Sequence, residues 1–452
     1  MTMFDPSARR PAAYERFVHE TPAWFTDAKF GIFVHWGPYS VPAWAEPLGE
    51  HGTQHDDWFL RNPYAEWYYN TIRIPGSPAS VHQREVWGDA PYDDFLDRWR
   101  AEAFDADAMI ALFARAGARY VVPTTKHHDG VTLWEAPGTG TRNTVHRGPR
   151  RDLVAEFERA ARAAGLRFGV YYSGGFDWHA ADTGPIWDAD DDSGARPLDA
   201  EYAAYAKAHV LDLVQRYGPD VLWGDIDWPD AGKPEGPDSF LHVLDAFYAR
   251  NPEGVVNDRF GATHWDFRTS EYQAGTDLED DGAWENCRGV GLSFGYNQRE
   301  DDLDVSLTGE AAVRHLVDVV SRGGNFLLNI GPDAAGRIPR VQRECLEGLA
   351  AWMGPHAAAV HGTRPVPAEI ARPQDEPWVR WTASPDGRHV NAMVDADGTV
   401  TLTGLTGRVD VAGAQLLDGR PVPVSKGGAG QIELQLPGRD VPGPAVVRFP
   451  LV

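Results

Sequence analysis

The strongest constraint on the fold of this chain is a repeated alternation of helix-like and strand-like segments between residues 29 and 355. The helical patterns cover residues 105–116, 152–164, 199–216, 239–250 and 309–322. Short stretches rich in β-branched or aromatic residues lie at 30–34, 119–125, 167–172, 221–225, 254–258 and 325–330. Such alternation is typical of parallel strands joined by right-handed helical crossovers, and its repetition predicts closure into a barrel. A doubly wound open sheet is the alternative with the same alternation.

The pattern changes after about residue 360, where the helical periodicity stops. Short alternating segments follow at 378–381, 390–394, 399–402, 409–411, 431–434 and 446–449. Asp-Gly and Gly-Gly pairs separate them, which is typical of hairpin turns. The sequence therefore predicts an α/β protein with a (β/α)8-like barrel as the catalytic domain over residues 1–358, followed by a small C-terminal antiparallel β-sandwich over residues 359–452.

Composition excludes several classes of function. A net charge of −24 argues against nucleic acid or an anionic membrane as a partner, because both require a basic surface. The glycine pairs lack the spacing of a nucleotide-binding loop, and the two cysteines form no metal motif, so no cofactor is expected. The first residues contain no apolar signal segment, so we expect a cytoplasmic protein, with secretion of a longer form left open.

Polar and charged side chains gather at the ends of the predicted strands, where barrel enzymes carry their active sites. These side chains are His35, His127, His128, Tyr171, Asp225 and Arg259. Asp225 follows an apolar strand and stands close to Trp223 and Trp228. Indole rings stack on the C–H face of a sugar, and a carboxylate can attack or stabilise an anomeric carbon. The pattern indicates a carbohydrate site, although a carboxylate after a strand can also serve only as a cap or turn residue.

A glycosidase needs a second carboxylate, and several are candidates. Glu271 follows a predicted strand and precedes Tyr272, which suits a partly buried general acid. The competing acids are Asp227, Asp266, Glu279, Asp280, Asp281 and Glu285, of which the last four fall in a predicted loop. We interpret Asp227 as a turn residue.

The histidines allow two interpretations. His127, His128 and Asp129, together with His35, could hold zinc, as in some barrel hydrolases. They could instead bind sugar hydroxyls, which we favour because no His-x-His pair accompanies them.

The chain resembles the α-L-fucosidases of glycoside hydrolase family 29. The matching segments are residues 24–37 (WFTDAKFGIFVHWG), 66–68 (EWY), 126–130 (KHHDG), 133–134 (LW), 169–175 (GVYYSGG), 220–225 (DVLWGD), 256–259 (VNDR), 327–332 (LLNIGP) and 336–339 (GRIP). They occur in the order typical of the family and extend over about residues 20–360. The resemblance implies a retaining hydrolase that releases terminal α-L-fucosyl groups from glycans or glycoconjugates.

The resemblance also assigns roles to particular residues. Asp225 corresponds to the nucleophile, and Glu271 to the acid/base of bacterial members. The positions that match fucose-binding residues are His35, Glu66, Trp67, His127, His128, Tyr171 and Arg259. Trp223 and Phe294 are expected to surround the methyl group of the sugar.

Two departures from the family pattern stand near the site. Gly224 replaces an asparagine that usually precedes the nucleophile, which predicts a less crowded neighbourhood for Asp225. Residues 45–60 are longer than expected and could either reshape the pocket or form a solvent-exposed insertion. A fucose-binding protein with little catalysis and a metal-dependent barrel hydrolase remain alternatives. The sequence leaves open which fucosyl linkage is preferred. It also leaves open the oligomeric state, for which a homo-oligomer is one alternative.

Overall fold

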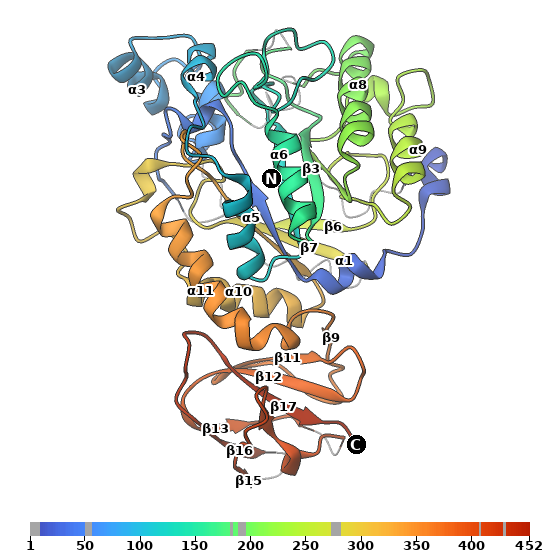
Figure 1. Ribbon diagram of the computed structural model, residues 1–452, viewed down its shortest axis with the longest axis vertical. Helices are drawn as coiled ribbons and strands as arrows, with labels where there is room; N and C mark the ends of the chain where they lie inside the picture. The colour runs from blue at the N-terminus through green and yellow to red at the C-terminus, as the bar shows by residue number, and fades with distance from the viewer. Residues whose placement is uncertain are drawn as a thin grey trace.

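The computed structural model describes residues 10–49, 57–180, 184–188, 196–272, 282–405, 408–427 and 431–452. The chain forms a large α/β unit and, beneath it, a smaller unit of antiparallel sheets (Figure 1). No helix in these ranges combines the length and the apolarity that a membrane crossing requires.

The α/β unit is built on one parallel sheet of eight strands. The strands are β1 (Phe30–Val34), β2 (Tyr120–Lys126), β3 (Arg167–Ser173), β4 (Val221–Asp225), β5 (Val255–Val256), β6 (Arg268–Glu271), β7 (Trp284–Gly289) and β8 (Asn325–Ile330). Their order in the sheet is β5-β4-β3-β2-β1-β8-β7-β6. A parallel bridge between Asn257 and Phe267 joins the two outer strands. This sequential order confirms the predicted barrel and argues against a doubly wound sheet, in which the strand order reverses.

The helices surround this sheet. They are α1 (Ala23–Ala28), α2 (Tyr68–Thr71), α3 (Pro78–Trp87), α4 (Asp93–Arg98), α5 (Ala106–Arg115), α6 (Leu153–Ala163), α8 (Ala200–Tyr217), α9 (Leu241–Arg250), α10 (Gly309–Ser321) and α11 (Arg340–His356). Short 3-10 turns lie at η1 (Ala12–Phe17), η2 (Pro38–Ser40), η3 (Ala65–Trp67), η4 (Asp230–Gly232), η6 (Gln298–Glu300), η7 (Ala357–Ala359) and η8 (Val411–Gly413).

The helices α5, α6, α8 and α10 begin at capping side chains. Asp105, Asp152, Asp199 and Thr308 each accept a hydrogen bond from the backbone N–H three residues further on. Such a cap satisfies one of the free N–H groups in the first turn and typically contributes about 1 kcal/mol.

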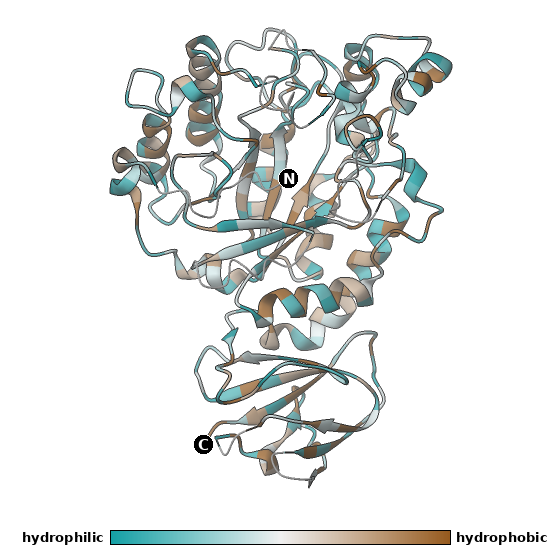
Figure 2. Cartoon of the chain, turned by 180° about the vertical axis from the view of Figure 1, so that it is seen from behind, coloured by the Kyte–Doolittle hydropathy of each residue, from teal (hydrophilic) through white to brown (hydrophobic). Residues whose placement is uncertain are grey.

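The strands β1 and β8 are buried along their whole length on both faces, which explains why apolar residues dominate them. Apolar residues along the central strands appear in brown in Figure 2. The inward-facing set includes Phe33, Tyr120, Val221, Trp223 and Leu327, which form one cluster inside the barrel. Because side chains alternate along a strand, Trp223 and Asp225 both point inward from β4.

The smaller unit contains two antiparallel sheets that face each other, as predicted for a β-sandwich. One sheet contains β9 (Arg364–Pro365), β10 (Gln374–Asp375), β11 (Trp378–Ala383), β12 (His389–Asp395), β14 (Gln415–Leu416) and β17 (Ala445–Pro450). The other contains β13 (Gly398–Leu402), β15 (Val424–Lys426) and β16 (Ile432–Leu436). The strand expected at 409–411 is absent as such, because Val409 makes one isolated bridge to Leu451 and η8 begins at Val411.

The two units share a packed seam beneath α10 and α11 (Figure 1). Trp352 belongs to the same buried cluster as Met393 and Val446 of the sandwich. Its indole Nε1 donates a hydrogen bond of 2.9 Å to the carbonyl oxygen of Pro444. The guanidinium of Arg380 crosses from β11 to Asp318 on α10, with Nε 2.7 Å from the carboxylate.

Candidate active site

Two carboxylates stand at the carboxyl ends of neighbouring parts of the barrel wall. Asp225 is the last residue of β4, and Glu271 is the last residue of β6. Because all eight strands run parallel, these ends meet at the same rim. The side chain of Asp225 is 11% exposed and that of Glu271 is 32% exposed, so Glu271 has the better access to solvent.

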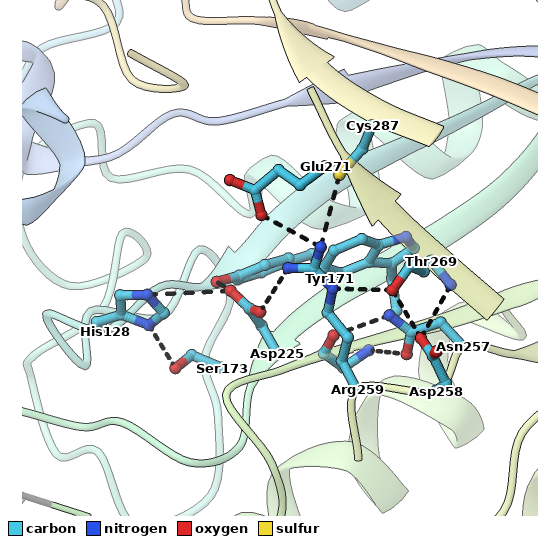
Figure 3. Close-up of polar contacts among 12 residues, drawn as sticks. His128, Tyr171, Ser173, Asp225, Asn257, Asp258, Arg259, Thr269, Glu271 and Cys287 are labelled. Carbon is cyan, nitrogen blue, oxygen red and sulfur yellow. Dashed lines mark hydrogen bonds and ion pairs between the residues drawn. The ribbon is translucent and has the colours of Figure 1, made fainter. Parts of the chain in front are cut away.

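One guanidinium group joins the two carboxylates. Arg259 lies 3.2 Å from Asp225 through Nη1 and Oδ1, and 3.2 Å from Glu271 through Nη2 and Oε2. Figure 3 shows the two acids on separate nitrogens of the same planar group. The third nitrogen, Nε, donates to Thr269 Oγ1 at 3.0 Å, so the orientation of the guanidinium is fixed on three sides.

Aromatic side chains form the floor beneath the nucleophile candidate. The hydroxyl of Tyr171 donates to Asp225 Oδ2 at 2.8 Å. The Tyr171 ring stacks on Trp223, with ring centroids 5.7 Å apart and planes inclined by 21°. The guanidinium carbon of Arg259 lies 4.8 Å from the centroid of the Trp223 ring. Both groups that hold Asp225 therefore rest on one indole.

His128 is held in one tautomer beside Asp225. Its Nδ1 lies 2.7 Å from Ser173 Oγ, and that hydroxyl donates its own proton to the carbonyl of Phe176. Nδ1 must therefore carry the proton, and Nε2, which lies 3.9 Å from Asp225 Oδ2, is left as an acceptor. Burial, followed by the charge of Lys126, lowers the pKa of His128 well below its ordinary value. A neutral ring with a free Nε2 can accept a hydrogen bond from a hydroxyl group.

His35 is also held in one tautomer by a hydrogen bond to its Nδ1. Its Nδ1 lies 2.7 Å from the side-chain oxygen of Asn329, whose amide donates to the carbonyl of Phe294 at 2.6 Å. Burial lowers the pKa of His35 to about 3, so this ring is neutral as well. His127 packs between His35 and Tyr171, and its buried Nδ1 forms no hydrogen bond within the described part of the chain.

The remaining predicted residues line the other side of the site. Glu66 accepts hydrogen bonds from Gly295 N at 2.7 Å and from Ser293 Oγ at 3.0 Å, and burial raises its pKa to about 7. The ring of Phe294 lies 5.1 Å from His35. Trp67 meets His128 edge-on, with centroids 5.6 Å apart. Through these contacts the structure brings together the residues that the sequence proposed.

Several supporting residues were missed by the sequence reasoning. Tyr64 donates to Glu271 Oε1 at 3.2 Å, and Ser173 and Asn329 fix the two histidines. Ser173 and Asn329 lie within matched segments, at the inner face of strand ends, so strand alternation could have found them. Tyr64 carries no comparable signal, because it lies in an irregular segment before η3.

The competing carboxylates are engaged elsewhere. Asp227 pairs with Arg196 at 2.7 Å and with Lys233 at 2.8 Å, in agreement with a structural role. Asp266 precedes β6, at the end of the barrel away from Asp225, and accepts from Tyr248. The expectation that Glu285 lies in a loop is wrong, because it is the second residue of β7 and is buried inside the barrel. Residues 279–281 lie outside the described residues.

Gly224 does not leave the neighbourhood of Asp225 less crowded. A Cβ atom placed on Gly224 would lie 2.6 Å from the ring of Phe260, so this ring occupies the space of the missing side chain. The side chain of Asn257 binds both backbone groups of Gly224, at 2.8 Å to its N and 2.9 Å to its O. The prediction of a less crowded neighbourhood for Asp225 is therefore wrong, because the ring of Phe260 fills the space beside Gly224.

The histidines at the rim do not share a close set of metal ligands. The carboxylate of Asp129 is turned to Tyr92 and to the backbone of Val131. In the described residues, the group close enough to share an ion is His19, His264 and Asp266, at the other end of the barrel.

The unusually long segment 45–60 is described only at its two ends, because residues 50–56 lie outside the described ranges. Trp58 and Phe59 pack with Trp67 in a cluster at the mouth of the barrel. The effect of segment 45–60 on the shape of the pocket stays a prediction.

Comparison with known proteins gives a consistent picture. The family described as Alpha-L-fucosidase matches residues 7–358. An alpha-L-fucosidase of Dictyostelium discoideum is 33% identical over 355 residues, which cover 76% of this chain and 72% of that protein. A Thermotoga maritima alpha-fucosidase in complex with a mechanism-based inhibitor is 40% identical, with a TM-score of 0.85 over 95% of this chain and 97% of that one. The same enzyme in complex with fucose gives a TM-score of 0.84 at 40% identity, over the same shares of the two chains. The chain therefore belongs to the α-L-fucosidase family.

Proposed function

We propose that this α-L-fucosidase acts by a retaining double displacement, with Asp225 as nucleophile and Glu271 as acid/base. The observation that carries the proposal is the shared guanidinium, because Arg259 holds one oxygen of each carboxylate at 3.2 Å. Retaining glycosidases place their two carboxyl groups about 5–5.5 Å apart, and inverting enzymes about 6.5–9.5 Å apart. Two acids on adjacent nitrogens of one small planar group fit the closer arrangement.

The roles of the two acids follow from their surroundings. Asp225 is the less exposed of the two, and Tyr171 and Arg259 fix both of its oxygens. An attacking atom needs such fixed placement. Glu271 is more exposed, which gives it access to the leaving group and later to water.

The steps conserve every proton. An oxygen of Asp225 bonds to the anomeric carbon while the glycosidic bond breaks, and Glu271 gives its proton to the departing oxygen. Water then attacks the fucosyl ester, Glu271 takes a proton from that water, and Asp225 is released as a carboxylate. The neutral rings of His35 and His128 accept hydrogen bonds from sugar hydroxyls, and Phe294 and Trp223 pack against the apolar face. The substrate class is a fucosylated oligosaccharide or glycoconjugate.

Retention can be read directly from the product. Hydrolysis of an aryl α-L-fucoside followed by proton NMR should show α-L-fucose first, before mutarotation produces the β anomer. Asp225→Ala should lose at least about 10³-fold in kcat. The matched control is Asp230→Asn, which changes an exposed carboxylate in the same loop and should retain wild-type kcat.

Two results would count against the proposal. Early appearance of the β anomer would indicate inversion and a different pair of acids. Near-wild-type hydrolysis by Asp225→Ala would remove Asp225 from the chemistry.

The same assay in EDTA should show full activity, since the proposed steps require only side chains of this chain.

A further inference from the structure

One loop connects three of the proposed sugar contacts. Residues 291–297, called here the pocket loop, lie between β7 and η6. The loop contains Phe294, and its backbone and Ser293 bind the carboxylate of Glu66. The carbonyl of Phe294 accepts from Asn329, which in turn holds His35. The pocket loop therefore contains Phe294 and contacts Glu66 directly and His35 through Asn329.

A buried carboxyl group outside the sugar site, that of Glu300, holds this loop on the side away from Glu66. Glu300 Oε2 accepts from Leu292 N at 3.0 Å, and Oε1 accepts from Ser293 N at 3.1 Å and from Asn297 Nδ2 at 3.3 Å. Glu300 is 7% exposed. In the described part of the chain, the hydrogen bonds of Glu300 come from amide groups of the pocket loop. Its carboxyl group therefore anchors the loop rather than forming half of a surface ion pair.

The chain leaves room for this anchor at Gly291. A Cβ atom on Gly291 would lie 1.8 Å from Glu300 Oε2, which is much closer than two non-bonded atoms can approach. Any other residue at this position would therefore displace the carboxyl group of Glu300. The backbone of Gly291 is outside the left-handed region, so the glycine is required by the close approach and not by its dihedral angles.

Ser293 lies between two buried acids. Its N–H binds Glu300, and its hydroxyl binds Glu66. Burial raises the pKa of Glu300 to about 8 and that of Glu66 to about 7. Placing two carboxyl groups in a buried region is costly unless both are hydrogen-bonded, and here the loop supplies the donors for both.

We propose that Glu300 is a positioning residue for the fucosyl pocket: it anchors the pocket loop and thereby fixes Phe294, Glu66 and His35 against the sugar. The inference rests on the proposed sugar-binding role of those three residues. Glu300 acts through the loop and touches no reacting atom. Its removal should weaken binding of the sugar more than it slows the chemical steps at Asp225 and Glu271, which stand on other strands.

The test compares Glu300→Ala, Glu300→Gln and Gly291→Ala with the wild type, using an aryl α-L-fucoside as substrate and L-fucose as inhibitor. Glu300→Ala should raise KM and the inhibition constant of L-fucose about tenfold, with kcat changed less than about threefold. Glu300→Gln keeps one acceptor oxygen and should recover part of the loss. Gly291→Ala should reproduce the effect of Glu300→Ala, because its Cβ displaces the carboxylate while leaving it in the sequence.

The control is Glu310→Gln on α10, which removes a part-exposed carboxylate 3.7 Å from Arg439 and should leave both constants unchanged. If the wild type hydrolyses the fucoside but Glu300→Ala and Gly291→Ala keep KM and the inhibition constant within about twofold, the inference is wrong and the proposed function stands. A fall in kcat alone would also overturn it. Absence of wild-type hydrolysis would instead defeat the proposed function. If Glu300→Ala does not fold, Gly291→Ala and Glu300→Gln decide the outcome.

Discussion

At the scale of single residues, Gly224 allows a close approach of Phe260 beside the nucleophile. A methyl group at this position would lie 2.6 Å from the Phe260 ring, so Gly224→Ala overpacks a buried site. Overpacking of this kind typically costs about 1–3 kcal/mol. We expect Gly224→Ala to lower the thermal unfolding midpoint measured by circular dichroism.

A double-mutant cycle identifies the cause. In a Phe260→Ala background the space is already vacated, so adding Gly224→Ala should cost little further stability. If Gly224→Ala lowers the stability equally in both backgrounds, a group other than Phe260 excludes a side chain at residue 224.

Ser173 gives a second test at this scale, because it fixes the tautomer of His128. Ser173→Ala removes the acceptor of the Nδ1 proton, and the ring can then place its proton on Nε2. We expect kcat/KM for an aryl α-L-fucoside to fall about tenfold while the thermal midpoint changes little. Ser321→Ala is the control, since it removes a hydroxyl that donates to a helix carbonyl on α10. An unchanged kcat/KM in Ser173→Ala would contradict the assigned tautomer.

At the scale of elements, β7 carries a buried acid across the barrel. Glu285 accepts from Trp223 Nε1 at 2.9 Å and from the hydroxyl of Tyr120, so it links β7 to β4 and β2. Burial raises the pKa of Glu285 from 4.5 to about 7. The folded protein therefore keeps this proton up to about pH 7, whereas the unfolded chain releases it near 4.5.

The sign of the pH dependence follows. The stabilisation from this proton is fully present below pH 4.5 and is lost as the pH rises through about 7. Glu285→Gln cannot titrate, so the stability of the wild type relative to the variant should fall by up to about 3 kcal/mol between pH 4.5 and pH 8. Thermal midpoints of both proteins across this range check the slope. A difference that stays constant, or rises with pH, would contradict the buried position of the carboxyl group.

Elements with apolar runs could be predicted from the sequence with their bounds, whereas those without apolar runs could not be bounded. The strands β1, β4 and β8 each contain a run of three or more apolar residues, and the sequence predicts each with the bounds that the structure gives. β6 reads Arg-Thr-Ser-Glu and β7 reads Trp-Glu-Asn-Cys-Arg-Gly. Their inward positions bind polar partners inside the barrel, so hydrophobic periodicity carries no signal for them.

The site was predictable to a similar degree. Residues at strand ends could be placed together, because parallel strands bring their carboxyl ends to one rim. Glu66, Trp67 and Phe294 came only from the family resemblance. Supporting contacts such as Glu300 to Ser293 depend on how loops far apart in the sequence pack, and local pattern does not encode that packing.

At the scale of the whole molecule, the barrel and the sandwich share a core. Trp352 on α11 is fully buried against Met393 and Val446, and its indole binds Pro444. Arg380 joins β11 to Asp318, and Arg314 pairs with Asp395 on β12. A seam that combines buried aromatic packing with paired charges couples the unfolding of the two units.

This coupling yields a calorimetric prediction. Trp352→Ala removes a fully buried tryptophan of the seam and leaves the Pro444 carbonyl without its donor, which should cost about 3–5 kcal/mol at the seam. The wild type should unfold in one transition, whereas the variant should show the sandwich melting below the barrel. Trp87→Ala is the control, because that ring packs on Phe95 and ends α3, which lies at the end of the molecule away from the sandwich (Figure 1). A single transition in Trp352→Ala, merely shifted to lower temperature, would show that other contacts couple the two units and that this tryptophan stabilises only the barrel.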